Sequence, residues 1–282
     1  LFLFEIVACS PNKNKVETMI LSLDTTFSEL SDSSFIPTRV MCMNVNNEDI
    51  YFSDYSGGIV VLDKSFNVKE KIGKRGEGPA EFLGAAHFYV EKEDSIYVLN
   101  EGKHAIELFV KGKHLKQIRY PKQASLTNCT RFFSENQLIF HSIISDSLST
   151  IVFDNNSHIC RFIGKYTDWD DPDLRLHSTR HVLKGDQSFF IIGCTLPVFQ
   201  IYSFDGKLIT EYDLKEIPEI NTVVKKYNMR AQTNTTYFTM IQDVYYDNHK
   251  IYLLVANNKD GYVCNEICIL EVEKDIKHIA TL

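Results

Sequence analysis

Apolar and polar residues alternate in short runs along most of the chain, and the same order of runs returns five times. Each repeat has an apolar strand, a polar turn and a second strand that opens with two large hydrophobic residues. A loop, a third strand, a tight turn and a fourth strand follow. The five opening pairs are Ile50-Tyr51, Ile96-Tyr97, Leu138-Ile139, Phe189-Phe190 and Ile251-Tyr252. Their spacings of 46, 42, 51 and 62 residues leave room for four half-buried strands per repeat.

The later strands of the repeats support this interpretation. The third strands are IVVLD (59–63), IELFV (106–110), TIVFD (150–154), IYSFD (201–205) and ICILEV (267–272). The fourth strands are VKEKI (68–72), LKQIRY (115–120), ICRFI (159–163), LITEYDL (208–214) and IKHIATL (276–282). One four-stranded sheet cannot bury both faces, so the repeats must stack around an axis. The pattern predicts an all-β fold, a β-propeller of four-stranded blades that forms one domain over residues 16–282. A sandwich or a barrel is the alternative.

The segment before the first repeat contains more strand-like sequence than that repeat needs. Residues 36–43 supply its first strand, whereas VETMILSL at 16–23 is left over. Propellers usually close by pairing strands from the two ends of the chain. We therefore expect a six-bladed type of propeller, with five readable blades and an incomplete closing blade to which residues 16–23 add a strand. Alternatively, a C-terminal portion is missing from the sequence, or the ring stays open or has five blades.

The motif GKRGEGPAEF at residues 73–82 lies between the first and second repeats. A phosphate-binding loop would need a lysine and then a hydroxyl residue after its second glycine, and neither occurs here. An acidic residue stands where the third glycine of G-x-G-x-x-G belongs, and no helix pattern follows that would present its N-terminus to an anion. We interpret the motif as a structural turn between blades, because glycine permits positive φ and proline fixes a turn. The residues of this turn are Gly76, Gly78, Pro79, Glu81 and Phe82.

The sequence begins with LFLFEIVAC, which is apolar except for Glu5. This stretch resembles the end of a secretion signal. Its last four residues resemble a bacterial lipobox, in which Cys9 would carry lipid. We expect residues 1–15 to be a truncated lipoprotein signal and tether, with the protein in the periplasm or at the outer membrane. A buried first strand is the alternative, and no other segment is apolar enough to cross a membrane.

Three features together resemble a known family. They are the motif G-x-G-P-[GA]-E-[FY] at residues 76–82, the lipobox, and the turn Asp205-Gly206-Lys207. The chain resembles the bacterial six-bladed TolB-like β-propeller lipoproteins, although Ala80 replaces the commoner glycine. The resemblance implies six blades and an envelope location. It implies no catalytic residues.

Charge and cysteine content narrow the class of partner. The net charge of −7 and the pI near 5.7 argue against nucleic acid, which needs a basic surface. Six cysteines remain besides Cys9, namely Cys42, Cys129, Cys160, Cys194, Cys264 and Cys268. Their spacings form no metal-binding pattern, so we interpret them as buried free thiols, with disulfides as the alternative in an exported protein. We expect no metal and no cofactor.

The connections between successive repeats all lie on one face of a propeller, and here they lengthen along the chain. Long loops on a rigid scaffold commonly carry function, which directs attention to residues 164–180 and 215–240. We expect a short helix near residues 219–230 that caps the channel or forms a basic patch. The acidic loop at residues 164–180 fits no calcium-binding motif. His177 and His181 are four positions apart, which is a weak pattern for a metal site. The candidate binding residues are Asp168, Trp169, Asp170, Arg175, His177, Arg180, Tyr227 and Arg230.

These observations favour a binding or interaction module of the cell envelope over an enzyme. The expected ligand is a protein or a saccharide at the long-loop face, near the mouth of the axial channel. The expected attachment to the membrane is through lipid on Cys9 alone. One alternative is a metal-dependent enzyme of the lactonase or lyase type, which would need an axial metal held by several blades. The other is a scaffold within a larger envelope complex, which would expose a large apolar patch.

Overall fold

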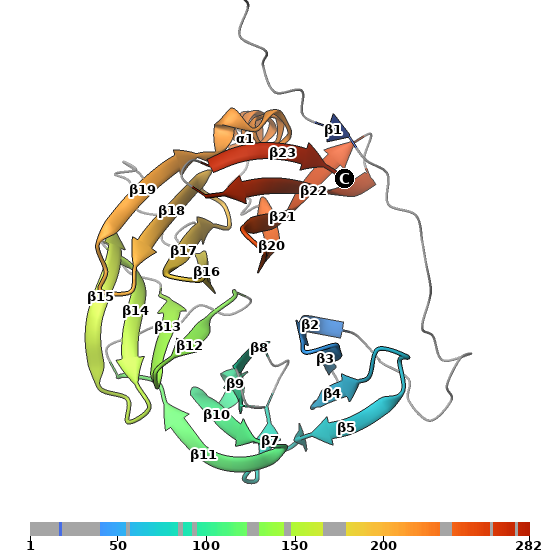
Figure 1. Ribbon diagram of the computed structural model, residues 1–282, viewed down its shortest axis with the longest axis vertical. Coiled ribbons are helices and arrows are strands. Elements are labelled where there is room, and N and C mark those ends of the chain that lie inside the picture. The colour runs from blue at the N-terminus through green and yellow to red at the C-terminus, as the bar shows by residue number, and fades with distance from the viewer. Residues whose placement is uncertain are drawn as a thin grey trace, which may run out of the picture.

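Five antiparallel sheets of four strands each stand side by side around a common centre (Figure 1). This computed structural model describes residues 17–18, 40–54, 57–83, 87–91, 95–122, 130–143, 148–165, 179–231, 239–259, 262–273 and 276–282. The first strand of every blade lies nearest the centre and the fourth lies at the rim (Figure 1). The predicted β-propeller of four-stranded blades is therefore confirmed, with five blades among the described residues.

The strand bounds follow the repeats closely. Blade 1 contains β2 (Val40–Asn46), β3 (Asp49–Asp54), β4 (Ile59–Leu62) and β5 (Val68–Ile72). Blade 2 contains β8 (His87–Glu91), β9 (Ser95–Asn100), β10 (Ala105–Val110) and β11 (Lys113–Arg119). Blade 3 contains β12 (Phe133–Glu135), β13 (Leu138–Ser142), β14 (Leu148–Asp154) and β15 (Ile159–Lys165).

The last two blades are built in the same way. Blade 4 contains β16 (Arg180–Lys184), β17 (Ser188–Gly193), β18 (Val198–Ser203) and β19 (Leu208–Asp213). Blade 5 contains β20 (Ile241–Asp247), β21 (Lys250–Lys259), β22 (Tyr262–Val272) and β23 (Ile276–Thr281). Short 3₁₀ turns lie at Glu101–Lys103 and Leu214–Glu216. Two short strands, β6 (Lys74–Arg75) and β7 (Glu81–Phe82), pair in parallel between blades 1 and 2.

The recurring aspartate after the third strand closes the turn to the fourth. Asp63 Oδ1 accepts hydrogen bonds from the backbone N–H groups two and four residues later, at 2.8 and 2.9 Å. Asp154 makes the same two bonds in blade 3, also at 2.8 and 2.9 Å. In blade 4 the hydroxyl of Ser203 accepts from the N–H of Lys207 at 3.2 Å. A short polar side chain thus replaces part of the backbone ladder where the chain reverses.

Burial differs between the strands of a blade because neighbouring blades cover both faces of the middle strands. All four residues of β4 are buried, and so are the first five of β10. At the rim, five of the six residues of β19 are exposed. The interface between blades 1 and 2 includes Phe82 and Phe109, whose ring centroids lie 5.8 Å apart. Strand order within each repeat therefore determines which residues form the core.

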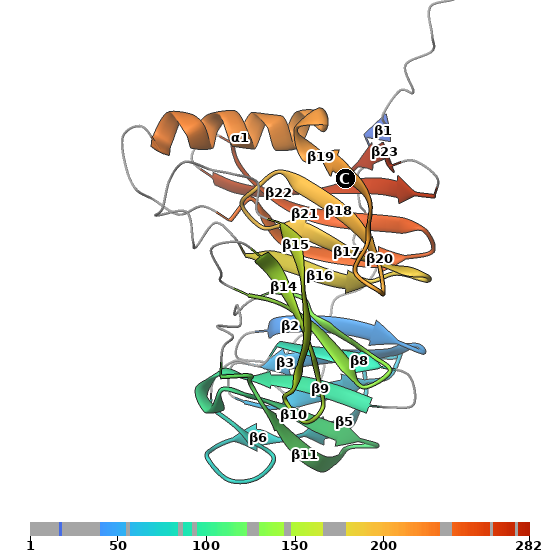
Figure 2. The ribbon, with the colours of Figure 1, turned by 90° about the vertical axis from the view of Figure 1, so that its left-hand side faces the viewer.

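The expected helix is α1 (Pro218–Ala231), on the connection from blade 4 to blade 5. Its first residue is proline, which helices tolerate at this position because the missing N–H has no partner there. Ile220 and Val223 bury one side of the helix against the core that blades 4 and 5 share. In the side view, α1 crosses the upper end of the molecule, above the strands of blade 5 (Figure 2).

The segment before blade 1 contributes one described element, β1 (Glu17–Thr18). It pairs in parallel with β23, with Glu17 opposite Ala280 and Thr18 opposite Thr281. These two residues extend the sheet of blade 5 at its rim, so a strand from residues 16–23 pairs with the last strand, as the expected closure requires. The rest of that segment lies outside the described residues.

Candidate functional site

The described part of the structure does not bring together the binding residues that the sequence predicted. Cys9, Asp168, Trp169, Asp170, Arg175 and His177 lie outside the described residues. Tyr227 and Arg230 lie in α1, where only their backbone is described. Arg180 was expected on an open loop, but it is the first residue of β16 and its exposed fraction is 1%. A side chain buried beside Gly193 offers no surface to a ligand, so that expectation for Arg180 is corrected.

A different group of polar side chains converges at the starts of the innermost strands, at the mouth of the axis. We call Cys42, Met43, His87, Arg131, His181 and Asp243 the axial cluster; they come from all five blades. Two of these strands begin with a β-bulge, between Val40 and Cys42 in β2 and between Ile241 and Asp243 in β20. A bulge redirects the side chains that follow it. It therefore helps to aim the starts of blades 1 and 5 at the axis.

Arg131 is the centre of the axial cluster. Its Nε and Nη2 donate to the two carboxylate oxygens of Asp243 at 2.6 and 2.5 Å. Its Nη1 donates to the carbonyl oxygen of Met43 at 2.8 Å. Its own carbonyl accepts from the N–H of Val182 at 2.9 Å. One residue of blade 3 thereby connects blades 1, 4 and 5.

The arginine also determines the ionisation of Asp243. Burial alone would raise the pKa of this carboxyl group, but the hydrogen bonds and charge of Arg131 outweigh burial and lower it. The pair is bidentate, which is the strongest arrangement of guanidinium and carboxylate. Both carboxylate oxygens of Asp243 are therefore occupied by hydrogen bonds from Arg131.

The histidines near the axis are neutral at physiological pH. Burial is the main cause that lowers the pKa of His87, His141 and His181 to about 4. His181 Nδ1 accepts from the N–H of Arg131 at 3.2 Å, so its proton lies on Nε2, which faces the carbonyl of Ile241 at 3.3 Å. Burial also raises the pKa of the Cys42 thiol. The axial cluster thus offers neither a base poised near neutral pH nor a thiolate.

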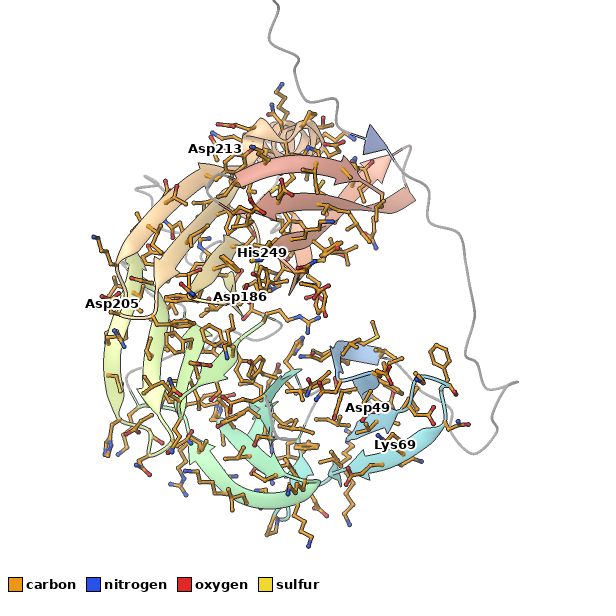
Figure 3. All side chains as sticks on the ribbon, viewed as in Figure 1. Asp49, Lys69, Asp186, Asp205, Asp213 and His249 are labelled. Carbon is orange, nitrogen blue, oxygen red and sulfur yellow. The ribbon has the colours of Figure 1, made fainter. Side chains whose placement is uncertain are left out.

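On the face opposite the long connections, turns of blades 4 and 5 contact each other. Asp186 lies in the turn before β17 and His249 in the turn before β21, and their side chains are neighbours near the centre of the view (Figure 3). The hydroxyl of Tyr246 donates to Asp186 at 3.0 Å, and His249 Nδ1 lies 3.6 Å from the same carboxylate. Both members of this ion pair are more than half exposed. Such surface pairs contribute little, and we assign this face no ligand.

A surface groove of about 960 Å³ lies beside blade 2, at the face of the long connections. We call it the blade 2 groove. Its walls are the turn between β6 and β7, the turn between β9 and β10, and the end of β11 with the residues that follow. The residues that line the walls include Glu77, Gly78, Pro79, Lys103, His104, Arg119, Tyr120 and Lys122. Its volume is in the range of ligand-binding clefts.

The floor of the groove is built around a buried carboxylate. Glu107 is 1% exposed and accepts hydrogen bonds from Asn100 Nδ2 at 3.1 Å and Gln117 Nε2 at 2.8 Å. The Nε2 of His114 lies 2.9 Å from its second oxygen. Three partners offset the desolvation of the charge. The floor is therefore fixed before any ligand arrives.

The glycine motif forms the edge of this groove. Lys103 Nζ donates to the carbonyls of Gly78 and Glu81, at 2.6 and 2.9 Å. The Glu81 carboxylate accepts from the N–H of Gly78 at 2.7 Å and pairs with Lys74 at 3.1 Å. A Cβ on Gly76 would lie 2.2 Å from that carboxylate. The glycines make room for the turn itself, and in the part of the chain that the structure describes no helix follows the motif directly to present its N-terminus to an anion.

The fold and these sites define a repeat protein of the β-propeller class. The chain belongs to a family described as 6-bladed beta-propeller, whose model matches residues 14–280. No curated protein matches the sequence. Within the described residues, no helix is both long and apolar enough to span a bilayer.

Solved structures share the fold at low sequence identity. An exported protein of Bacteroides fragilis NCTC 9343 has 15% identity and a TM-score of 0.59, over 91% of this chain and 73% of that one. A protein of unknown function from Bacteroides caccae has 9% identity and a TM-score of 0.53, over 86% of this chain and 81% of that one. A catalytically inactive virginiamycin B lyase from Staphylococcus aureus, solved with quinupristin, has 9% identity and a TM-score of 0.50. It is covered over 69% of its length, and this chain over 86%. At these identities the likeness concerns the fold.

Comparison of equivalent positions in the repeats would have revealed the axial residues. Met43, His87, Arg131, His181 and Asp243 each precede the hydrophobic pair of their repeat by seven to nine residues. That position is the start of the innermost strand, which always faces the axis. The floor of the blade 2 groove gives a weaker signal, a glutamate within the otherwise apolar strand IELFV at 106–110.

Proposed function

We propose that this protein is an extracytoplasmic, non-catalytic binding module whose ligand occupies the blade 2 groove. The observation that carries the proposal is the groove's floor, where the buried Glu107 is held by Asn100, His114 and Gln117. A largely preformed cleft with a few precisely placed polar groups is the usual arrangement of a ligand site. The proposal keeps the expected long-loop face but moves the ligand from the axis to blade 2.

The proposed ligand is an acidic saccharide. Lys103, Arg119 and Lys122 lie around the groove, whereas its acids are Glu77 and the fully partnered Glu107, in a protein whose net charge is −7. Arginine binds carboxylate and phosphate groups in a two-pronged manner. Amide, imidazole and hydroxyl groups at the floor and walls suit the hydroxyls of a sugar. A protein partner would instead favour an apolar, aromatic centre.

Residues at the axis support binding over metal-dependent catalysis. An axial metal would need free carboxylates and imidazoles from several blades. Among the described residues, Asp243 is engaged by Arg131 on both oxygens, and both ring nitrogens of His181 have partners. The Arg131 guanidinium therefore takes up the carboxylate that an axial cation would need.

The proposed location is the bacterial cell envelope, with residues 1–15 as signal and tether and lipid on Cys9 as the anchor. The support is the lipobox-like sequence and the fold shared with an exported protein of Bacteroides fragilis. Membership of the TolB-like lipoproteins belongs to the same proposal. Globomycin treatment and mass spectrometry of the native chain would test the anchor, and a Cys9→Ser chain that stays membrane-bound would contradict it.

Calorimetric titration with a panel of uronate-containing oligosaccharides would test the ligand class. We expect the change Arg119→Ala with Lys122→Ala to weaken binding at least tenfold at low salt, because two cations leave the groove. The matched control is Lys113→Ala with Lys207→Ala, which removes two exposed cations from turns on the opposite face. Equal affinity of both double variants would reject the groove. Binding of neutral oligosaccharides only would reject the charge argument, and capture of a protein but no saccharide would reject the ligand class.

A further inference from the structure

Three side chains with metal-binding atoms meet on the rim side of blade 5, away from both the axial cluster and the blade 2 groove. They are Glu219 from the first turn of α1, Cys268 from β22 and His278 from β23, with ligand atoms within 4.8 Å of one another. They form the sole such group of three within the described ranges. We propose that these residues bind a divalent cation of the zinc type and so fasten α1 to the outer strands of blade 5.

The donor set matches the chemistry of zinc. Thiolate sulfur, imidazole nitrogen and carboxylate oxygen are the three protein donors that zinc takes, commonly in a tetrahedral arrangement. A calcium or magnesium ion would prefer oxygen donors throughout. Three protein ligands leave a fourth position for water or for the hydroxyl of Thr281. The mixed set therefore favours zinc over the hard cations.

The polar groups here already converge on one point. Thr281 Oγ1 donates to Glu219 Oε1 at 3.0 Å, and His278 Nε2 lies 3.0 Å from the same hydroxyl. Cys268 is opposite Thr281 in the ladder of β22 and β23 and is 0% exposed. The second carboxylate oxygen of Glu219 is buried without a hydrogen-bond partner among the described groups. A cation would give that oxygen the partner it otherwise lacks.

Binding requires one proton to leave. Zinc binds the thiolate form of cysteine, so the Cys268 thiol exchanges its proton for the metal–sulfur bond, and the proton passes to solvent. Zinc bonds of about 2.0 to 2.3 Å place tetrahedral ligand atoms roughly 3.5 Å apart. The three ligand atoms lie within 4.8 Å of one another, so they would move closer together when the metal binds.

The site would connect α1 with two consecutive strands of blade 5 that come much later in the sequence. α1 is the connection into blade 5, β22 is its third strand, and β23 is the strand on which β1 adds. A metal bound to the folded chain alone stabilises that fold by mass action. The expected role is structural: it would hold α1 and the rim of blade 5 together.

Cobalt(II) titration of the metal-free full chain would test the proposal. We expect one equivalent to produce the near-ultraviolet absorption of a cobalt–thiolate bond, zinc to abolish it, and zinc to raise the Tm by several degrees. Cys268→Ser should lose the thiolate band, and His278→Gln should weaken binding at least tenfold. Cys194→Ser is the matched control, because Cys194 is another buried thiol and lies in blade 4.

Each outcome decides the question. Absence of a thiolate band and of any Tm shift in the wild-type chain at 100-fold excess metal would overturn the proposal. So would a band that persists in Cys268→Ser or disappears in Cys194→Ser. If Cys268→Ser unfolds, circular dichroism will reveal it, and the His278→Gln variant then carries the test. Saccharide binding at the blade 2 groove is measured separately, so failure of one proposal leaves the other standing.

Discussion

At the residue scale, backbone conformation explains the glycine motif better than side-chain chemistry does. Gly73 has φ +70°, and a Cβ there would lie 2.2 Å from the ring of Phe82, which is fully buried. Ala80 has φ +62°, a region that favours glycine because Cβ approaches the backbone. Ala80, which stands where the motif more commonly has glycine, therefore adopts a strained backbone conformation.

Replacing Ala80 by glycine should stabilise the protein. The left-handed conformation of alanine costs about 1 to 2 kcal/mol, and the larger entropy of unfolded glycine offsets about 0.5 to 1 of that. We expect Ala80→Gly to raise the free energy of unfolding by about 0.5 to 1 kcal/mol in urea titrations. Ala105→Gly is the matched control within strand β10 and should lower stability by about 1 kcal/mol. Equal effects of the two changes would contradict the conformational argument.

At the element scale, helix α1 owes its position to packing. Fewer than half of its residues are apolar, and its sequence carries two lysines and an arginine. Ile220 and Val223 join a cluster of residues from blades 4 and 5. Helices of this length are marginal alone, so tertiary contact provides most of their stability.

Truncation of the buried side of α1 should therefore destabilise blade 5. Ile220 is 0% exposed, so Ile220→Ala should cost about 2 to 4 kcal/mol through lost burial and a cavity. Lys225→Ala, on the exposed side of the same helix, should change stability by less than 0.5 kcal/mol. Thermal and urea denaturation would measure both. An equal, small loss in the two variants would mean that the helix is not part of the cooperative core.

At the scale of the whole molecule, Arg131 joins blades that are distant in sequence. Its bonds to Met43 and Asp243 span 88 and 112 positions. Blades of a repeat protein otherwise contact only their neighbours. A connection across the centre therefore couples the two ends of the described ring.

A double-mutant cycle on Arg131→Met and Asp243→Asn would measure that coupling. We expect a coupling energy of about 1 to 2 kcal/mol. This is below the roughly 3 to 5 kcal/mol that is lost when one partner of a fully buried pair is removed, because the Asp243 side chain is 42% exposed. The pKa of Asp243 is lowered in the fold, so its contribution is complete above the ordinary value of 3.8 and is lost as pH falls through the folded value. Additive single changes at pH 7 would show that the pair stabilises nothing, and a coupling that grows in acid would contradict the sign.

Local pattern was enough for the elements but not for the site. The hydrophobic pairs located the second strand of every blade, and the aspartates after the third strands located turns that Asp63 and Asp154 close. Polar residue type was a poor guide to exposure, because Arg180 has a charged side chain yet is buried where β16 begins. Loop length directed attention to residues 164–180 and 215–240, whereas the groove formed beside shorter connections.

The sequence by itself determined the class of fold, because strand period and turn chemistry are local properties that repeat five times. It also determined that GKRGEGPAEF is a turn, since spacing alone excluded the phosphate loops. Only the tertiary structure decided which polar side chains meet. Arg131 and Asp243, or Glu219 and Cys268, are far apart in the chain and become neighbours when the blades close around one axis and α1 packs against blade 5. Contacts of that kind depend on how the repeats are stacked. The sequence of a single repeat does not show which residues the neighbouring repeats place beside it.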